Sequence, residues 1–423
     1  MPPDPQPVTS PDPSATSGAP PDGRAPGRLG RIVAAAIVVI GLVLFAAGRA
    51  DGPGAPGTDS PGSGSPGAGD PSAGSSLRGS PTPPAHSPAA TPRPSGQPAG
   101  EYMLIDRATL ESLPMDGPAW ESLLDAADGS LGRPNLANQD ARHPVRTLAV
   151  ALVYARTGDS AYREKARDAI MRAIDTVDEG SHNSVLSLGR QLAAYVLAAD
   201  FIELSGTDDE AFREWLDEVR TRDLGGHGRW KALTATHEDS PNNWGNHAGA
   251  ARAAVAIYLG DGEDLARTAD VFRGWLGDRS AYDGFGYGDL SWQCDPEKPV
   301  GINPAGCTKD GVVIDGALPE EMRRGDSFRW PPVHTGYAWE GMQGALLQAE
   351  LLFRAGYDTW NWSDQALLRA TEFLYERARW PAEGDDSWQP WLIDARYGTS
   401  YHASAPAAFG KNFGFTDWLY GSD

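Results

Sequence analysis

The sequence predicts a mainly α-helical protein, an α/α barrel or an incomplete toroid of helical hairpins. Before this domain it predicts a disordered leader, one membrane-spanning or signal segment and a disordered linker. Three observations support these predictions. Apolar residues recur at the helical period in pairs of neighbouring segments, alternating strand patterns are scarce before residue 284, and residues 1–100 consist mostly of Pro, Gly, Ser and Ala.

The charge of the chain is unevenly distributed. Its 423 residues have a formal net charge of −21, while residues 1–100 contain six Arg and six Asp and are neutral overall. The surplus of acid therefore belongs to residues 101–423. Such a balance excludes a basic nucleic-acid-binding protein, and adhesion to anionic lipid is not expected.

The composition divides the chain into four parts, namely a disordered leader (1–30), an apolar segment (31–50), a disordered linker (51–100) and a folded domain (101–423). Residues 32–47 carry no charge, and Arg28 and Arg31 precede them, which places the N-terminus inside the cell. The leader is long for a cleaved signal peptide, so we favour a single-pass anchor in the cell membrane with the folded domain outside. Secretion after signal cleavage is the alternative.

Helical segments of the folded domain come in pairs. In each pair a helix rich in small apolar residues precedes a charged one, and Gly158 and Gly260 are expected helix stops. A repeated helix–turn–helix unit favours a curved or closed stack, with the small-residue helices as the inner ring. The expected pairs are 145–158 with 161–177, 184–204 with 208–219, 245–260 with 264–276, and 337–356 with 364–379.

The chain has two cysteines, Cys294 and Cys307, in a stretch rich in Gly, Pro and Asp. In an exported protein, two thiols in one loop favour a disulfide over a metal pair. We therefore expect a bond between them, with two unpaired thiols as the alternative. The sequence shows no metal-ligand spacing, and no metal is expected.

The first stretch with potential for chemistry is 237–247, which reads His-Glu-Asp-Ser-Pro-Asn-Asn-Trp-Gly-Asn-His. Ser240 is expected to cap a helix whose first residue is Pro241. Asn243 and His247 then share one helix face. The free N–H groups of a helix start attract a carboxylate, so the stretch fits an acidic sugar, with an amide donor and a titratable base. The alternative is a pair of Asn residues that only cap the helix, with His247 in the core.

The second stretch is 315–326, which contains Glu321 and Arg324 and is followed by Trp330 and Tyr337. A Tyr at the start of an inner helix can transfer a proton when an Arg lies nearby, because a cation favours the phenolate. The alternative is a surface network of Arg and Glu with the Tyr packed in the core.

Together and in this order, the two stretches resemble alginate lyases of the mannuronate-cleaving α/α-toroid type, polysaccharide lyase family 5 and its relatives. The resemblance covers residues 138–351. The family's Leu-Pro-x-Glu-x-x-Arg-Gly motif is matched at 318–325, and Tyr337 precedes an Ala-Glu-Leu run on one helix, as the family's catalytic Tyr does. Trp244 stands where the family has His, and 326–336 contains an apparent insertion.

The resemblance implies β-elimination on a uronic-acid polysaccharide such as alginate or glucuronan. Asn243 and Arg324 would neutralise the sugar carboxylate. His247, or else His237, would remove the proton at C5. Tyr337 would protonate the leaving oxygen, or serve as both base and acid. No cofactor is implied, the partner is an acidic polysaccharide, and we expect a monomer.

Further side chains are expected to bind the sugar chain. A polyanion needs a basic groove within this acidic protein, so Arg190, Arg323, Arg324 and Arg329 are expected to line it while the acids lie on the outer helices. Aromatic rings offer flat apolar faces to sugars. The expected substrate-binding residues are Asn242, Trp244, Arg190, Arg323, Trp339 and His237.

Two other functions fit the same pattern. A glycoside hydrolase on the same architecture would need two carboxyls across the groove, for which Glu238, Asp239, Glu320 and Glu321 are available. A cell-surface glycan-binding protein that has lost catalysis would explain Trp244 in place of the family's His. A lyase differs from both because it releases an unsaturated, ultraviolet-absorbing product without consuming water.

Overall fold

The structure, a computed structural model, describes residues 101–181, 183–225 and 231–421. The expected leader, the apolar segment 31–50 and the linker lie outside the described residues. Among the residues that it does describe, none of the helices combines the length and apolar character needed to cross a membrane. The single-pass anchor stays a prediction.

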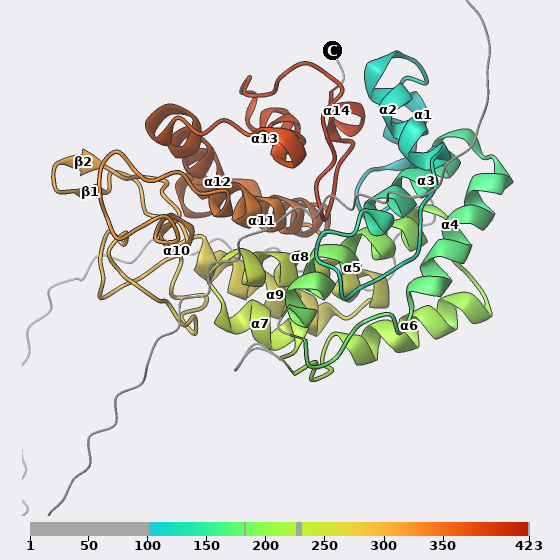
Figure 1. The fold of residues 1–423 in the computed structure, drawn as a ribbon, viewed down its shortest axis with the longest axis horizontal. Helices are drawn as coiled ribbons and strands as arrows, with labels where there is room; N and C mark the ends of the chain where they lie inside the picture. Colours follow the sequence, from blue (N-terminus) through green and yellow to red (C-terminus); the bar gives the residue numbers. More distant parts are fainter. Residues whose placement is uncertain (1–100, 182, 226–230, 422–423) are drawn as a thin grey trace, which may run out of the picture. The chain divides into compact units, whose positions relative to one another are not determined.

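The described residues are mainly helical, and Figure 1 shows their arrangement. The strands β1 (Thr308–Lys309) and β2 (Val312–Val313) form a small antiparallel hairpin. The helices are α1 (Arg107–Ser112), α2 (Gly117–Asp128), α3 (His143–Thr157), α4 (Ser160–Ala173), α5 (Ser184–Phe201), α6 (Thr207–Val219), α7 (Leu233–Asp239), α8 (Asn243–Leu259), α9 (Gly262–Trp275), α10 (Pro319–Met322), α11 (Tyr337–Arg354), η1 (Thr359–Asn361), α12 (Trp362–Glu372), η2 (Phe373–Ala378), η3 (Gly384–Asp386), α13 (Gln389–Tyr397) and α14 (Thr416–Leu419).

The expected helix pairs are present. The inner helices α3, α5, α8 and α11 are followed by the outer helices α4, α6, α9 and α12, and η2 extends the last of these. Gly158 and Gly260 follow α3 and α8 in the left-handed conformation, each with φ of 72°, which a residue with a Cβ adopts only at a cost. The mainly helical fold is therefore confirmed.

The inner helices form an arc in chain order. α5 packs on α3 and α8, and α8 packs on α11 (Figure 1). Glycine permits the closest approaches. A Cβ on Gly189 of α5 would lie 3.0 Å from the Ala248 nitrogen, and a Cβ on Gly344 of α11 would lie 2.4 Å from the Asn246 carbonyl carbon. The backbones of α8 and α11 therefore touch next to His247.

Short C-terminal elements return the chain to its first helices. α11 contacts α13, α13 contacts α14, and α14 contacts α2, which packs on α3. The indole N–H of Trp418 donates to the Pro114 carbonyl (2.8 Å), and the centres of the Trp418 and Trp120 rings are 5.5 Å apart. Contacts through α13, α14 and α2 thus close the arc of inner helices into a circuit.

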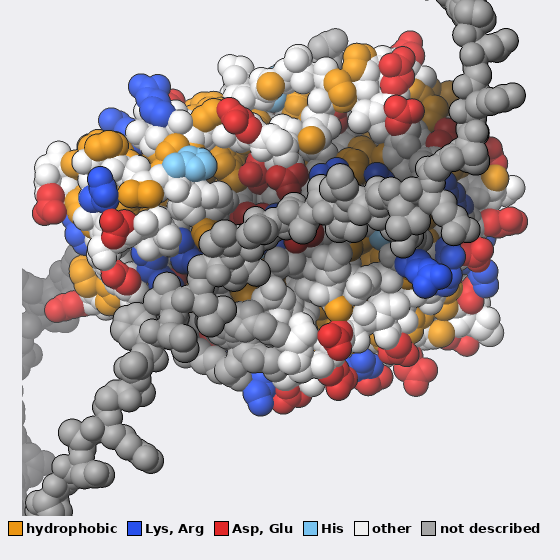
Figure 2. Space-filling model, in the orientation of Figure 1, with side chains coloured by type: hydrophobic (Ala, Val, Ile, Leu, Met, Phe, Trp, Pro, Cys, Tyr) orange, Lys and Arg blue, Asp and Glu red, His pale blue; other side chains and the backbone are white. Residues whose placement is uncertain are grey.

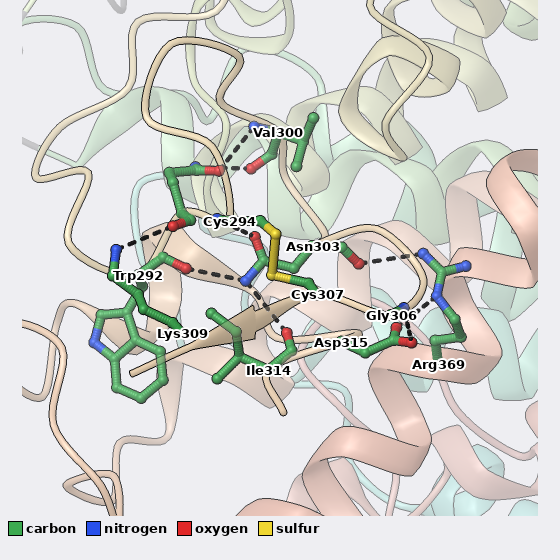
Figure 3. The surroundings of a disulfide bond; sticks show 11 residues. Trp292, Cys294, Val300, Asn303, Gly306, Cys307, Lys309, Ile314, Asp315 and Arg369 are labelled. Atoms are coloured by element: carbon green, nitrogen blue, oxygen red, sulfur yellow. Dashed lines mark hydrogen bonds and ion pairs between the residues drawn. A yellow bond between two sulfur atoms is a disulfide. The ribbon is translucent and has the colours of Figure 1, made fainter. Parts of the chain in front are cut away.

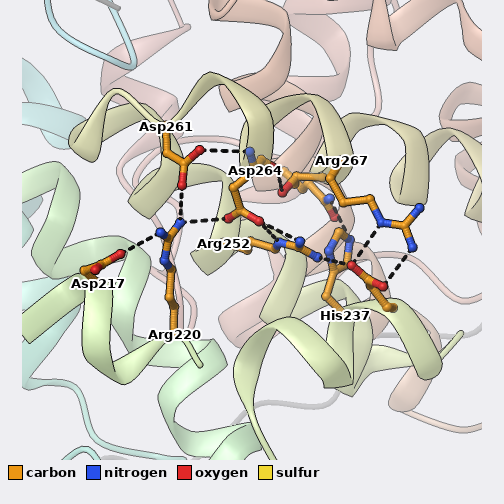
Figure 4. A network of polar contacts seen from close by, with 10 residues as sticks. Asp217, Arg220, His237, Arg252, Asp261, Asp264 and Arg267 are labelled. Atoms are coloured by element: carbon orange, nitrogen blue, oxygen red, sulfur yellow. Dashed lines mark hydrogen bonds and ion pairs between the residues drawn. The ribbon is translucent and has the colours of Figure 1, made fainter. Parts of the chain in front are cut away.

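Ion pairs join the outer layer to α8 (Figure 4). Arg220, which follows α6, and Arg252 of α8 both bind Asp264 of α9, at 3.1 and 2.6 Å. Arg252 and Arg267 both bind Glu238 of α7, at 3.0 and 2.8 Å. Four helices are held in register by these shared carboxylates.

The long connection between α9 and α10 carries a disulfide (Figure 3). Cys294 and Cys307 are bonded, as expected, with their Cα atoms 5.8 Å apart. Asn303 organises the loop between them, because its side-chain N–H donates to the Trp292 carbonyl (3.0 Å) and its side-chain oxygen accepts from the Cys294 N–H (3.1 Å). This connection leads the chain to the second motif stretch at α10.

Candidate active site

The first motif stretch places two Asn residues at the start of α8. The N-cap is Asn242, whose side-chain oxygen accepts from the Trp244 N–H (3.0 Å), and the helix begins at Asn243. The expectation of Ser240 as N-cap and Pro241 as first helical residue is wrong by two positions. The start of α8 lies later because Ser240 is the C-cap of the preceding helix α7. The Ser240 hydroxyl donates to the side chain of the observed N-cap, Asn242 (2.8 Å).

The second stretch meets this helix start through Glu321 of α10. The Asn243 backbone N–H donates to Glu321 Oε1. The same oxygen lies against α11, since a Cβ on Gly341 would be 3.1 Å from it. Asn243 and Glu321 are both buried, and burial raises the pKa of the Glu321 carboxyl to about 8. Elements from three parts of the chain therefore meet at one carboxyl.

Arg324 and Tyr337 lie together beside this junction. The guanidinium carbon of Arg324 is 4.0 Å from the centre of the Tyr337 ring, and Tyr337, the first residue of α11, is 40% exposed. The chain between them folds back, because a Cβ on Gly325 would lie 2.6 Å from the Val333 carbonyl oxygen. The insertion 326–336 therefore loops outward while its two flanking side chains stay in contact.

His247 lies one turn along α8 from Asn243, beside Glu340 of α11. Its Nε2 is 3.8 Å from a Glu340 carboxylate oxygen, and the ring is fully buried. Burial lowers the pKa of His247 to about 4, so the imidazole is neutral at pH 7. Glu340 also pairs with Arg190 and Lys411. Burial opposes the ionisation of Glu340, yet His247 and the two cations hold its pKa well below the usual range.

Buried polar atoms without a hydrogen-bond partner gather at these residues. Among the described residues they include Asn243 Oδ1, both ring nitrogens of His247, Glu321 Oε2 and Arg190 Nε. Buried polar groups are nearly always satisfied by protein, water or a ligand. The start of α8 and the facing parts of α5, α10 and α11 therefore have the unsatisfied groups that a polar ligand would meet.

Two expected sugar-binding residues make core contacts instead. Trp339 is buried, and its indole N–H donates to the Trp380 carbonyl (2.9 Å). His237 is buried with its Nε2 3.0 Å from the Gln348 side-chain nitrogen, several turns along α11 from Tyr337. Burial also holds the pKa of His237 well below its usual range. The structure does not bring these two side chains to the Arg324–Tyr337 pair, whereas Trp244 is buried directly after Asn243.

Fewer of the expected arginines are available to bind a polyanion than the sequence predicts. Arg190 pairs with Glu340, Arg323 with Glu320 (2.5 Å) and Arg329 with Asp326 (3.7 Å). Within the part of the chain that the structure describes, no carboxylate oxygen lies within 4.0 Å of the Arg324 guanidinium nitrogens. The acids do occupy an outer helix, because α6 begins with an acidic turn, and Figure 2 shows acidic side chains along the lower right edge. Arg324 is thus the cation of this set that remains available.

Glu340 and Lys411 also belong to the site, although neither was predicted from the sequence. Lys411 lies far along the chain, on a segment that is held to α11 because the Asn412 side chain donates to the Gln343 carbonyl (2.9 Å). Its ammonium group binds Glu340 and is 3.7 Å from Asp140. A Glu one turn after Tyr337 on an inner helix is a signal that could have indicated Glu340, but no local pattern indicates Lys411.

Comparisons with known proteins cover part of this site. The family model described as alginate lyase matches residues 135–287. Among solved structures, the chain is similar to alginate lyase A1-III from Sphingomonas species A1, with 15% sequence identity and a TM-score of 0.49 over 75% of this chain and 93% of that one. It is also similar to an alginate lyase from Bacteroides ovatus, with 15% identity and a TM-score of 0.42 over 66% of this chain and 72% of that one. No curated protein sequence matched.

The family match includes Asn242, Asn243 and His247 and ends before Arg324 and Tyr337. It spans the helices from α3 to α9. Residues 135–287 thus carry the sequence pattern of the alginate lyase family, which confirms the expected resemblance over the first motif stretch, while the second stretch lies beyond the match.

Proposed function

We propose that the protein is a polysaccharide lyase that cleaves a uronic-acid polysaccharide, such as alginate or glucuronan, by β-elimination. The observation that carries the proposal is the contact between Arg324 and Tyr337 beside the start of α8, in a chain whose residues 135–287 match the alginate lyase family. A cation, an amide and a phenol are the groups that can neutralise a sugar carboxylate and protonate a leaving oxygen.

Neutralising the carboxylate is the first task of such a site. The proton at C5 is only weakly acidic while the neighbouring carboxylate keeps its charge, so donors must stabilise the enolate that develops. Arg324 has no competing carboxylate within 4.0 Å among the described residues and can pair with the sugar. Asn243 adds an amide donor at a helix start, where the dipole also favours negative charge.

His247 is assigned as the base that removes the C5 proton. It is neutral at pH 7, and Glu340 at 3.8 Å stabilises the imidazolium that forms. Tyr337 then donates its hydroxyl proton to the leaving oxygen, and the guanidinium over its ring stabilises the charge left on the phenol. The C5–H and C4–O bonds break and the C4–C5 double bond forms, while the C5 proton is left on His247 and the Tyr337 proton on the released sugar. Proton exchange with water then returns the imidazolium and the phenolate to their starting forms. His237 is not assigned as base because it packs against Gln348.

The hydrolase alternative is less well supported. A glycoside hydrolase needs one carboxyl that gives up a proton and a second that acts as base or nucleophile. Of the four candidate carboxyls, Glu238 is ion-paired with Arg252 and Arg267 and Glu320 with Arg323, while Glu321 is buried with its Oε1 bound to the Asn243 backbone N–H. Trp330, in the insertion, has an exposed ring that a sugar chain can pack against. Such a contact is expected both of a lyase and of a glycan-binding protein, so it does not distinguish between them.

The deciding experiment incubates the purified full-length protein with alginate, with glucuronan and with a neutral glucan as control. A lyase produces ultraviolet absorbance with the polyuronates only, and its products are lighter than hydrolysis products by one water. Products that contain the added water and show no absorbance would establish a hydrolase. Retention on immobilised polyuronate without any product would establish a glycan-binding protein.

We also propose that residues 31–50 anchor the protein in the cell membrane as a monomer, with the domain outside. The apolar run and the arginines before it support this placement. An anchored chain stays in the membrane fraction after a high-salt wash and is released by detergent, whereas a cleaved chain appears in the culture medium with a shortened N-terminus.

A further inference from the structure

Glu321 and its neighbour Glu320 are held in different ways. Glu320 pairs with Arg323 (2.5 Å) and accepts from the Gly288 N–H (2.8 Å). Glu321 is 1% exposed, and among the described residues no Lys, Arg or His nitrogen lies within 4.0 Å of its carboxyl. Its Oε1 accepts from the Asn243 backbone N–H, and its Oε2 has no partner.

The Asn243 side chain has a matching unsatisfied atom. Its amide oxygen, Oδ1, is buried and accepts no hydrogen bond. Two acceptor oxygens therefore lie on residues that are already joined by a hydrogen bond, and each would cost about 1–3 kcal/mol if left unsatisfied. A proton on Glu321 Oε2 would make that oxygen a donor, and Asn243 Oδ1 is an unsatisfied acceptor on the residue to which Glu321 is already bonded.

We propose that Glu321 works as an uncharged carboxylic acid whose hydroxyl donates to Asn243 Oδ1 and so turns the Asn243 amino group toward the substrate carboxylate. Glu321 is then a positioning residue that acts through Asn243. This inference rests on the proposed lyase function. It also explains how a carboxyl can lie beside the binding place of a sugar acid, since an uncharged acid does not repel it.

The surroundings of Glu321 favour the protonated form of its carboxyl. Burial raises its pKa to about 8, although Arg324 opposes the shift, so Glu321 is protonated at pH 7 and loses its proton as the pH rises through about 8. Ionisation removes the donor to Asn243 and places a negative charge next to the sugar carboxylate. The charged neighbours of Glu321 on its own segment are Glu320, Arg323 and Arg324. On the two helices that touch its carboxyl, the titratable groups within one turn of the contact are His247 on α8 and Tyr337 and Glu340 on α11.

The test compares pH profiles of kcat/KM for the full-length wild type, Glu321→Gln, Glu321→Met and the matched control Glu320→Gln. Wild type and Glu320→Gln should lose activity as the pH rises through about 8. Glu321→Gln keeps an N–H donor that cannot ionise, so it should stay within about threefold of wild type at pH 7 and lose this alkaline decline. Glu321→Met has no donor and should lose about tenfold at pH 7, the scale of one hydrogen bond.

A second readout does not depend on turnover. The infrared difference spectrum between wild type and Glu321→Gln should contain a protonated-carboxyl band at pH 7 that disappears above pH 9. Parallel pH profiles, or a folded Glu321→Gln that is inactive at pH 7, would overturn the inference. If the wild type releases no unsaturated product from any polyuronate, the proposed function fails, while the infrared band still decides whether Glu321 carries the proton.

Discussion

The guanidinium of Arg324 lies 4.0 Å from the centre of the Tyr337 ring, although the whole loop 325–336 separates the two residues. The loop therefore keeps its ends together. A cation on the ring face can serve two purposes in one reaction, because it attracts the sugar carboxylate and stabilises the charge that develops on the phenol.

Replacing Arg324 or Tyr337 should abolish most of the activity. Tyr337→Phe and Arg324→Ala are each expected to lower kcat roughly a hundredfold, the scale of losing a general acid or a charge-stabilising donor. Arg324→Lys should recover only part of the loss, since an ammonium group cannot stack its plane on the ring. Initial rates from ultraviolet absorbance measure these effects. Arg273→Ala on the outer helix α9 is the control, and full activity of Tyr337→Phe would remove the proposed acid.

The contact between α8 and α11 should be intolerant of a single methyl group. In Gly344→Ala the new Cβ would lie 2.4 Å from the Asn246 carbonyl carbon, so the two helices must separate. Overpacking of this kind costs about 1–3 kcal/mol and also displaces His247 relative to Glu340. Urea denaturation and kcat measure the two effects.

Gly336→Ala is the matched control for this substitution. Gly336 precedes α11 with φ of −69°, and a Cβ on it would have no heavy atom within 4 Å. We expect wild-type stability and activity from it. Equal behaviour of the two alanine variants would contradict the close helix contact.

His143 should make the free energy of unfolding depend on pH. Burial lowers its pKa from 6.5 to about 4, so between these values the unfolded chain binds more protons than the folded one. The free energy of unfolding therefore contains about 3 kcal/mol from this histidine above pH 6.5, and this amount is lost as the pH falls to 4. Asp200 acts in the opposite direction, because burial raises its pKa to about 7.

The comparison between variants isolates the histidine. Urea denaturation at several pH values between 4.5 and 7 should show a weaker acid destabilisation in His143→Gln than in wild type. His334→Gln, at an exposed histidine, is the control and should follow wild type. Identical pH slopes for all three proteins would show that His143 does not enter the folded state uncharged.

The disulfide should stabilise the connection between α9 and α10. Closing a loop with the sequence separation of 13 between Cys294 and Cys307 is worth about 3 kcal/mol in the chain-entropy model. The double variant Cys294→Ser/Cys307→Ser should therefore unfold at a lower temperature than wild type. Reductant should lower the unfolding temperature of wild type toward that of the variant, and a variant that remains sensitive to reductant would point to another cause.

Local patterns predicted the helices well and the long-range contacts poorly. Periodicity and glycine stops placed the inner helices, since both depend on neighbouring residues. The predicted start of α8 lies two residues before the observed one because Ser240 and Asn242 are both good N-caps. Only the end of α7, at Ser240, decides between them. A capping preference does not say which of two adjacent helices a residue serves.

The candidate site shows the same limit. The motifs indicated Asn243, Arg324 and Tyr337, which the structure brings to one region of α8, α10 and α11. The pairing of Lys411 with Glu340 joins segments far apart in the chain, and the sequence has no periodic signal for such a contact. Composition alone also could not show that Arg190 and Arg323 are occupied by carboxylates.

The closing of the helix circuit by α13, α14 and α2 affects how the chain can be altered. Lys411 and Trp418 belong to segments that reach the middle of the fold and its first helices. A premature stop codon before position 411 would leave the Glu340 carboxylate short of one counter-ion and Trp120 without its ring partner. Late nonsense mutations should therefore lower the activity as much as substitutions at the candidate active site. The protein should become active only after residues 411–418 have left the ribosome.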